Sequence, residues 1–300
     1  MKVLNFGSLN IDYVYGVDYF VRAGETLKAR SREIFPGGKG LNQSVALARA
    51  GARVYHAGCI GPEGEMLRAL LSKDGVDVSL LRQVDAPQGH TVIQVDRKGQ
   101  NCILLYGGSN RCVQPSQVDE TLAGFGAGDW LVLQNEINLL PQIVDAAYER
   151  GMRIALNPSP WEDNLKDVDF GKLTWLLVNE IEACQSADCA RPEQAWEALH
   201  ARWSGLSVLI TLGGAGSVAH QVTGNGIFEV RQQAFPAQTV DTTAAGDTFT
   251  GYFIAGLAAG MTLPACMRRA SMAASISVAR PGAAGSIPER DEVEAGLSRL

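Results

Sequence analysis

The 300-residue chain has little of what marks secreted, membrane or metal-dependent proteins. Its six cysteines are scattered with no C-x-x-C pair, which in a chain of this length favours free thiols in a reducing compartment. The four histidines are isolated and no H-E-x-x-H motif occurs, so Cys184 and Cys189 are more simply explained as incidental thiols than as metal ligands. No apolar run approaches a membrane span, and the first residues lack the apolar core of a signal peptide.

The charge pattern and the glycine pattern argue against two further classes of protein, nucleic-acid-binding proteins and nicotinamide-dependent oxidoreductases. The 26 basic and 32 acidic residues give a formal net charge of −6, without a basic tract or a basic–aromatic cluster. We therefore expect a cytoplasmic protein with no nucleic-acid partner and no membrane partner. A nicotinamide-dependent oxidoreductase would need G-x-G-x-x-G after the first strand, whereas that strand ends Gly7-Ser8-Leu9-Asn10.

What the chain does have is a repeated alternation of apolar strands and helices. The expected strands are 3–9, 54–60, 130–134, 153–156, 174–178 and 207–212, with a hairpin at 218–231. The expected helices are 43–50, 63–73, 139–150, 192–204, 248–260, 263–279 and 290–300. Such repeats predict an α/β fold with a mainly parallel sheet covered on both faces. At 46% hydrophobic residues the chain can bury one large core or two small ones.

Two segments lack the continuous apolar runs of the main strands and predict a small second sheet. In residues 13–35 apolar and polar residues alternate loosely, and the alternating stretches 89–96 and 101–106 predict a hairpin around the turn 97–100. We expect them to leave the main body together.

Polar or glycine-rich residues follow almost every strand of the main sheet. They are Asn10 and Asp12, Asn135 and Glu136, Asn157, Asn179 and Glu182, and Gly213 to Gly216. The carboxyl ends of parallel strands share one edge, where open α/β sheets bind ligands. Asn10 and Asp12 lie two apart and point the same way in an extended segment. An amide beside a carboxylate suits the vicinal hydroxyls of a sugar, and a plain strand-end turn explains the pair equally well.

Two helix starts are rich in small residues. One is Pro36-Gly37-Gly38-Lys39-Gly40-Leu41-Asn42, and the other is Asp241-Thr242-Thr243-Ala244-Ala245-Gly246-Asp247. Unpaired N–H groups and the helix dipole favour an anion at such a start, and small side chains let it approach. Asp247 then places a carboxylate beside an anion cradle, as a kinase base requires, although a capping role alone would also explain it.

Together these two stretches resemble the two signatures of the ribokinase-like carbohydrate kinases of the phosphofructokinase B type. The resemblance covers essentially the whole chain in the right order, including Asn157-Pro158-Ser159-Pro160, Asn179-Glu180-Ile181-Glu182 and Thr211-Leu212-Gly213. It implies a single domain, residues 1–300, with three α/β/α layers. It also implies a small β lid formed by about 13–35 and 89–107, and a homodimer that pairs through the lids.

The resemblance further implies a role for each matching position. Asp247 would be the general base, and the N–H groups of Ala244, Ala245, Gly246 and Asp247 would form the anion hole. The sugar would be held by Asn10, Asp12, Gly38, Lys39, Asn42 and Glu136. Positions on the ATP side are Asn179, Thr211, Gly213, Gly216 and Ser271, with Glu182 ordering water around Mg²⁺. A K⁺ site would be formed, largely by backbone carbonyls, at Asp241, Thr243, Ser277, Arg280, Gly282 and Ser286.

The resulting hypothesis is an ATP-dependent kinase acting on a primary hydroxyl of a pentose, with D-ribose giving ribose 5-phosphate. The alternatives are a kinase for another furanose, a hexose or a nucleoside, and a catalytically silent sugar-binding protein on the same fold. Ala244 and Ser271 depart from the wider family pattern, and His90 and Thr91 on the lid hairpin can change which sugar fits.

Overall fold

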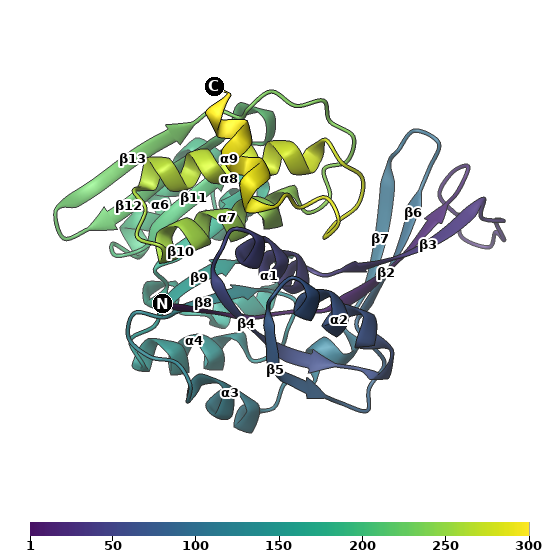
Figure 1. The fold of residues 1–300 in the computed structure, drawn as a ribbon, viewed down its shortest axis with the longest axis horizontal. Helices are drawn as coiled ribbons and strands as arrows, with labels where there is room; N and C mark the ends of the chain where they lie inside the picture. The colour runs from purple at the N-terminus through teal and green to yellow at the C-terminus, as the bar shows by residue number, and fades with distance from the viewer. Residues whose placement is uncertain (300) are drawn as a thin grey trace.

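The computed structural model describes residues 1–299 and places two sheets side by side (Figure 1). Over this range the large sheet has nine strands in the order β13-β12-β11-β10-β9-β8-β1-β4-β5. Its strands are β1 (Lys2–Phe6), β4 (Arg53–Ile60), β5 (Asp77–Gln83), β8 (Trp130–Gln134), β9 (Arg153–Asn157), β10 (Trp175–Asn179), β11 (Ser207–Thr211), β12 (Ser217–Thr223) and β13 (Gly226–Gln232). All neighbours pair in parallel except β11–β12 and β12–β13, so the predicted mainly parallel sheet is confirmed.

Helices cover both faces of this sheet. One face carries α1 (Lys39–Arg49), α2 (Glu65–Lys73), α7 (Ala245–Ala258), α8 (Leu263–Val278) and α9 (Arg290–Ser298). The other carries α3 (Pro115–Leu122), α4 (Leu140–Glu149), α5 (Glu180–Ala187) and α6 (Ala195–Arg202). Alternate strand residues supply the two cores: Trp130 and Val132 face the first helix layer, Leu131 and Leu133 the second. The three predicted layers are therefore present.

The small sheet is formed by β3-β2-β6-β7 and projects from the side of the molecule where the main strands end (Figure 1). Its strands are β2 (Asn10–Gly16), β3 (Ser31–Gly37), β6 (His90–Val95) and β7 (Asn101–Tyr106). β2 follows β1 after three residues, so the first main strand leads directly into the small sheet. Both lid segments expected from the sequence contribute to it.

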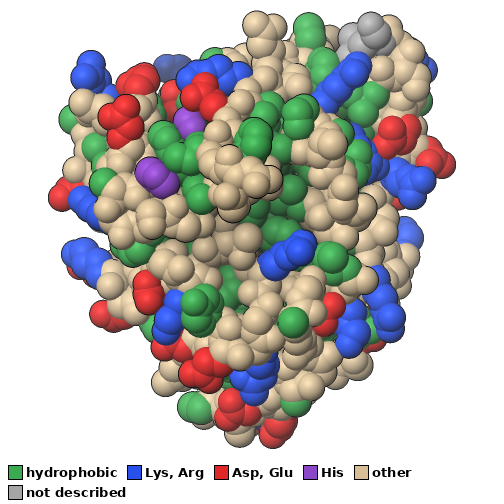
Figure 2. All heavy atoms as spheres, turned by 90° about the vertical axis from the view of Figure 1, so that its left-hand side faces the viewer, with side chains coloured by type: hydrophobic (Ala, Val, Ile, Leu, Met, Phe, Trp, Pro, Cys, Tyr) green, Lys and Arg blue, Asp and Glu red, His purple; other side chains and the backbone are tan. Residues whose placement is uncertain are grey.

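Figure 2 shows the face of the molecule away from the small sheet. Acidic and basic side chains alternate there around a shallow hollow lined by hydrophobic ones, so this face carries no field of one sign. Within residues 1–299 no helix combines the length and the apolar composition that crossing a bilayer requires. All six cysteines are free thiols.

The main differences from the expected elements lie at the helix starts. α1 begins at Lys39 rather than residue 43, and α7 at Ala245 rather than 248. Gly40 in α1 and Gly246 in α7 lower helix propensity in these first turns, so the sequence favoured a loop there. β5, α3 and α5 were not expected, and the first strand ends at Phe6 instead of residue 9.

Candidate active site

The starts of α1 and α7 lie together at the edge where the main strands end. The two helices pack closely because Gly251 of α7 has no side chain: a Cβ there would lie 2.4 Å from the Cβ of Ala46 in α1. Gly38 caps α1 with φ of +94°, a conformation that favours glycine, and a Cβ on it would lie 2.9 Å from the backbone nitrogen of Asn10. Gly251 thus lets α1 lie close to α7, and Gly38 of the first signature lets it lie close to β2.

Asp247 lies in the first turn of α7 and is buried, with 7% of its surface exposed. Asn42 Nδ2 donates to its Oδ2 at 3.1 Å, and Gln43 Nε2 donates to its Oδ1 at 2.9 Å. A carboxylate held by neutral amides and facing a cavity is suited to accept a proton.

The backbone at the start of α7 presents free donors. Among the described residues, the N–H groups of Gly246 and Asp247 have no backbone acceptor, whereas Ala245 N–H donates to Thr242 O at 3.2 Å. Ala244, the residue before the helix, has φ of +60°, which costs an L-residue about 1–2 kcal/mol. Of the four N–H groups expected to form an anion hole, those of Gly246 and Asp247 are the best placed to bind one.

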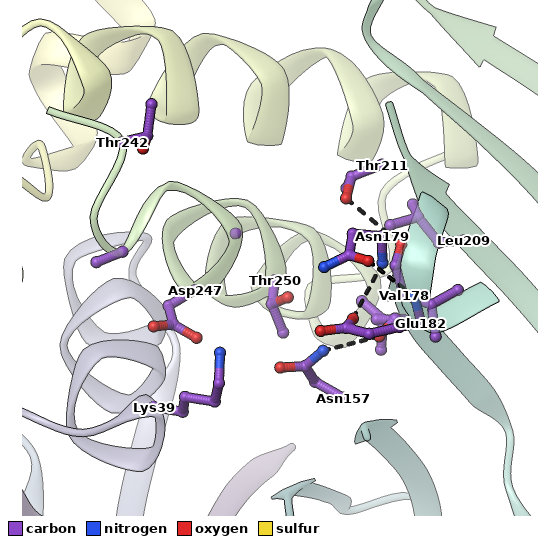
Figure 3. Close-up of a pocket in the computed structure, with 13 residues that line it drawn as sticks. Lys39, Asn157, Val178, Asn179, Glu182, Leu209, Thr211, Thr242, Asp247 and Thr250 are labelled. Atoms are coloured by element: carbon purple, nitrogen blue, oxygen red, sulfur yellow. Dashed lines mark hydrogen bonds between the residues drawn. The ribbon is translucent and has the colours of Figure 1, made fainter. Parts of the chain in front are cut away.

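Lys39 extends from the start of α1 toward Asp247 (Figure 3). Burial lowers the pKa of its ammonium, but the negative charges of Asp247, Glu136 and Glu182 raise that pKa more, so the side chain stays protonated. The site therefore contains a cation between three carboxylates.

The hydroxyl-binding residues expected from the sequence lie at the junction of the two sheets. Asn10 and Asp12 are buried on β2, and Glu136 is buried just after β8. Lys39 N–H donates to Glu136 Oε2 at 3.1 Å, which joins the start of α1 to the end of β8. Asn42 Oδ1 is buried and has no partner within residues 1–299, so it is open to a ligand donor.

Several residues that support this group were missed by the sequence reasoning. Asn110 Nδ2 donates to Asn10 Oδ1 at 2.7 Å, Thr91 Oγ1 donates to Asp12 Oδ1 at 2.6 Å, and Ser8 donates to Glu136. Asn110 lies in a short 3₁₀ helix, Gly108–Arg111, 100 residues from Asn10, and no local motif in the sequence marks it as a partner of Asn10. Thr91 was noted as a lid residue, but its partner could not be known without the pairing of β2 with β6.

The carboxyl group of Asp12 has a raised pKa. Burial raises the pKa of its carboxyl to about 6, with the Thr91 hydrogen bond opposing this and the charge of Glu136 adding to it. Below that pH Asp12 is neutral and a poorer acceptor for a hydroxyl. We expect the KM for the sugar to rise as the pH falls from 7 to 5, and Asp12→Asn to flatten this rise. A KM independent of pH over that range in the unmodified protein would contradict the assignment.

A cavity of about 240 Å³ extends from Asp247 across the ends of β9, β10 and β11 (Figure 3). Lys39, Asn157, Asn179, Glu182, Thr211 and Thr250 are among its lining residues. Asn179 and Glu182 form a reciprocal cap at the start of α5, with Glu182 N donating to Asn179 Oδ1 at 2.9 Å and Asn179 N donating to Glu182 Oε2 at 3.1 Å. This cap fixes the Glu182 carboxylate at the cavity wall.

A second cavity of about 590 Å³ adjoins the first and shares Thr211, Thr242 and Gly246 with it. Its walls include the expected residues Gly213, Gly216 and Ser271, together with the apolar side chains of Phe235, Phe249 and Val278. Ser271 Oγ donates to Gln233 O at 3.2 Å. A polar cavity that opens into a larger apolar one has the character of a site for phosphates joined to a base.

The loops expected to hold a monovalent cation are tied together by Asp241. Its Oδ1 accepts from Thr243 N and Oγ1 at 2.9 and 2.7 Å, and its Oδ2 accepts from Gly282 N at 2.9 Å. Partial burial raises the pKa of Asp241, but these hydrogen bonds outweigh it and hold the pKa below its usual value. Ser277 and Ser286 are buried and share a 2.8 Å hydrogen bond.

Arg280 contributes no side chain to these loops, because its guanidinium pairs with Glu292. Within residues 1–299 no cluster of three or more His, Cys, Asp or Glu side chains is placed to hold a metal ion.

A family model, curated sequences and solved structures all show that this chain is similar to carbohydrate kinases of one family. The sequence model of the pfkB family of carbohydrate kinases matches residues 1–290. The ribokinase of Haemophilus influenzae is 34% identical over 300 residues, with 95% of each chain covered, and that of Bacillus subtilis is 34% identical over 296 residues, covering 97% of this chain and 98% of the relative. Among solved structures, ribokinase from Thermotoga maritima matches with a TM-score of 0.87 at 33% identity over 99% of both chains. Arabidopsis thaliana ribokinase, complexed with ribose and ATP, has a TM-score of 0.85 at 29% identity over 99% of this chain and 98% of its own.

Proposed function

The chain belongs to the pfkB family of carbohydrate kinases, and we propose that it transfers the γ-phosphoryl group of ATP to the primary hydroxyl of D-ribose, giving ribose 5-phosphate and ADP. The observation that carries this proposal is the start of α7. There a buried carboxylate and two free backbone N–H groups lie within one helical turn, between a hydroxyl-binding pocket and a polar cavity. The chain resembles two proteins named ribokinase over nearly their whole length, and this resemblance supports ribose as the acceptor.

In this mechanism Asn10, Asp12, Asn42 and Glu136 bind the sugar hydroxyls, with Gly38 allowing close approach. Asp247 accepts the proton of the primary hydroxyl, and that oxygen attacks the γ-phosphorus while the bond to the ADP oxygen breaks. The N–H groups of Gly246 and Asp247 and the ammonium of Lys39 stabilise the charge on the transferred group. The larger cavity, with Gly213, Gly216 and Ser271, holds the nucleoside.

The polar cavity also suits a hydrated Mg²⁺, because its oxygen donors are carboxylates and amides. Glu182, fixed by its cap, and Asn179 would hold the waters of that ion, which would neutralise phosphate charge when bound with ATP.

The loop anchored by Asp241 motivates a potassium proposal. A cation bound by its carbonyls would stabilise the turn that precedes the free N–H groups of α7. We expect turnover to be faster in K⁺ than in Na⁺ or in cation-free buffer, and Asp241→Ala to remove most of that difference. Equal rates of the unmodified protein in all three buffers would refute the cation site and leave the base assignment unaffected.

The small sheet is proposed to act as the lid over the sugar and as the dimer contact. β7 is exposed along its whole length, with Leu104 70% and Ile103 55% exposed, which leaves an unpaired apolar surface. We expect a homodimer in solution at micromolar concentration, and Leu104→Glu to shift it toward monomer. Sedimentation equilibrium measures this, and a monomeric unmodified protein would exclude the contact. Free thiols and a soluble sugar substrate fit a cytoplasmic location.

The experiment that tests the function is ADP release from Mg·ATP in potassium buffer across a panel of pentoses, hexoses and nucleosides. Clear turnover with ribose alone establishes the proposal. Turnover with another sugar retains the mechanism and changes only the acceptor, with His90 and Thr91 as the first residues to examine. Binding of ATP with no turnover on any member would instead favour a silent sugar-binding protein.

A further inference from the structure

Gln43 contacts the proposed base although it is not among the residues expected to bind the sugar. It follows Asn42 in α1 and is fully buried, with no exposed surface. Its Nε2 donates to Asp247 Oδ1 at 2.9 Å, and the same group lies 3.4 Å from Asn157 Oδ1. A buried glutamine whose donor points at a reacting carboxylate requires a reason beyond packing.

The orientation of the Gln43 amide is determined by a buried network. Gln134 Nε2 donates to Gln43 Oε1 at 2.7 Å and to Asn5 Oδ1 at 2.9 Å. Asn5 Nδ2 in turn donates to Gly40 O at 2.7 Å and to Ser44 Oγ at 2.8 Å. Because Gln43 Oε1 is the acceptor for Gln134, its Nε2 must face Asp247; a flipped amide would place oxygen against oxygen and nitrogen against nitrogen.

The two amides that hold Asp247 are not equivalent. Asn42 Oδ1 has no partner among the described residues, so this side chain is free to exchange its contacts when a sugar arrives. Gln43 has both ends of its amide occupied by buried protein groups. It can therefore hold Asp247 Oδ1 in place whether or not substrate is present.

We propose that Gln43 is a positioning residue that fixes the Asp247 carboxylate through Oδ1 and leaves Oδ2 as the atom that receives the sugar proton. This inference rests on the proposed role of Asp247 as the base. The terminal torsion of an aspartate is broad, so one strong donor on one oxygen sets the direction of the other. Loss of that donor lets the carboxylate rotate away from the hydroxyl, and small misplacements of reacting groups can reduce a rate about 10²-fold.

The test compares Gln43→Met with Gln117→Met as a matched control. Gln117 is also a buried amide, 2% exposed, which donates to Gly58 O at 2.9 Å, but it lies on α3 against the opposite face of the sheet. Both variants keep side-chain length and lose buried hydrogen bonds at both ends of an amide, to Asp247 and Gln134 for Gln43 and to Gly58 and Cys59 for Gln117, so similar decreases in Tm are expected. For Gln43→Met we expect kcat to fall by about 10–100-fold, with sugar KM and ATP KM nearly unchanged. For Gln117→Met we expect kcat close to that of the unmodified protein.

A double-mutant cycle shows whether Gln43 acts through Asp247. In an Asp247→Asn background, Gln43→Met should cause almost no further loss of kcat, because residues that act as a unit are not additive. Equal losses of kcat with and without the Asp247 carboxylate would overturn the inference, as would a Gln43→Met enzyme as active as the control. If Asp247→Asn alone retains full turnover, the result refutes the role of Asp247 as the base, on which the role of Gln43 rests.

Discussion

Asp247→Asn should reduce kcat by about 10²–10⁴-fold, the usual contribution of a general base. Asparagine has the same shape and can still accept from Gln43 through its amide oxygen. The change therefore removes the proton acceptor while leaving the fold, the pocket and the packing of α7 intact. Steady-state ADP release at saturating sugar and ATP measures the effect.

Binding measurements supply the control for this variant. Titration calorimetry with ribose, and with a non-hydrolysable ATP analogue, should give affinities close to those of the unmodified protein, because Asn10, Asp12 and the nucleotide cavity are unchanged. Tm should also be nearly the same. Turnover near the unmodified level would refute the base assignment and leave Asp247 with only a structural role, as the acceptor that joins α7 to Asn42 and Gln43 of α1.

Much of the site was visible in the sequence because it consists of short segments at strand ends. Once the strands are parallel and in one sheet, Asn10, Glu136, Asn157 and Asn179 must lie near one edge, and the observed strand order, which the sequence did not predict, brings them there. The two helix starts rich in small residues could also be recognised from the sequence, because a close approach of a ligand to the backbone requires small residues at fixed positions.

The supporting contacts could not be predicted, because they depend on tertiary pairing between distant residues. Asn110 reaches Asn10 only because the segment after β7 returns to the start of β2, and Gln43 reaches Asp247 only because Gly251 lets α1 and α7 pack closely. The early starts of α1 and α7 were missed for a related reason. The glycines in these first turns, Gly40 and Gly246, lower helix propensity and favour a loop, and local propensity alone does not reveal that the helices begin there.

Lys39→Met should have the second large effect, on both catalysis and stability. Its ammonium faces Asp247 and lies in the field of Glu136 and Glu182. Among the residues that line the polar cavity of about 240 Å³, Lys39 is the one with a cationic side chain, and the substitution removes that charge. Loss of one preformed stabilising group in a water-poor site costs about 10²–10³-fold in kcat. Methionine keeps the length and apolar stem, and the Lys39 N–H bond to Glu136 belongs to the backbone and remains.

The stability of this variant should depend on pH in a defined direction. Burial raises the pKa of Glu136, and the charge of Lys39 opposes that rise. Without Lys39 the folded-state pKa of Glu136 rises further above its unfolded value, so the folded state binds more protons than the unfolded state. The free energy of unfolding of Lys39→Met therefore falls as the pH rises from the unfolded-state pKa of Glu136 through its folded-state pKa. The deficit in Tm relative to the unmodified protein should be larger at pH 8 than at pH 5.

Lys39→Arg separates charge from position. Arginine restores the positive charge and should recover most of the Tm lost at pH 8, but its planar guanidinium cannot replace a compact ammonium, so kcat should stay well below that of the unmodified enzyme. A Lys39→Met protein with the same Tm deficit at pH 5 and pH 8 would show that Lys39 does not compensate the buried carboxylates. A kcat reduced by less than about tenfold would place the ammonium outside the group that stabilises the transferred phosphoryl.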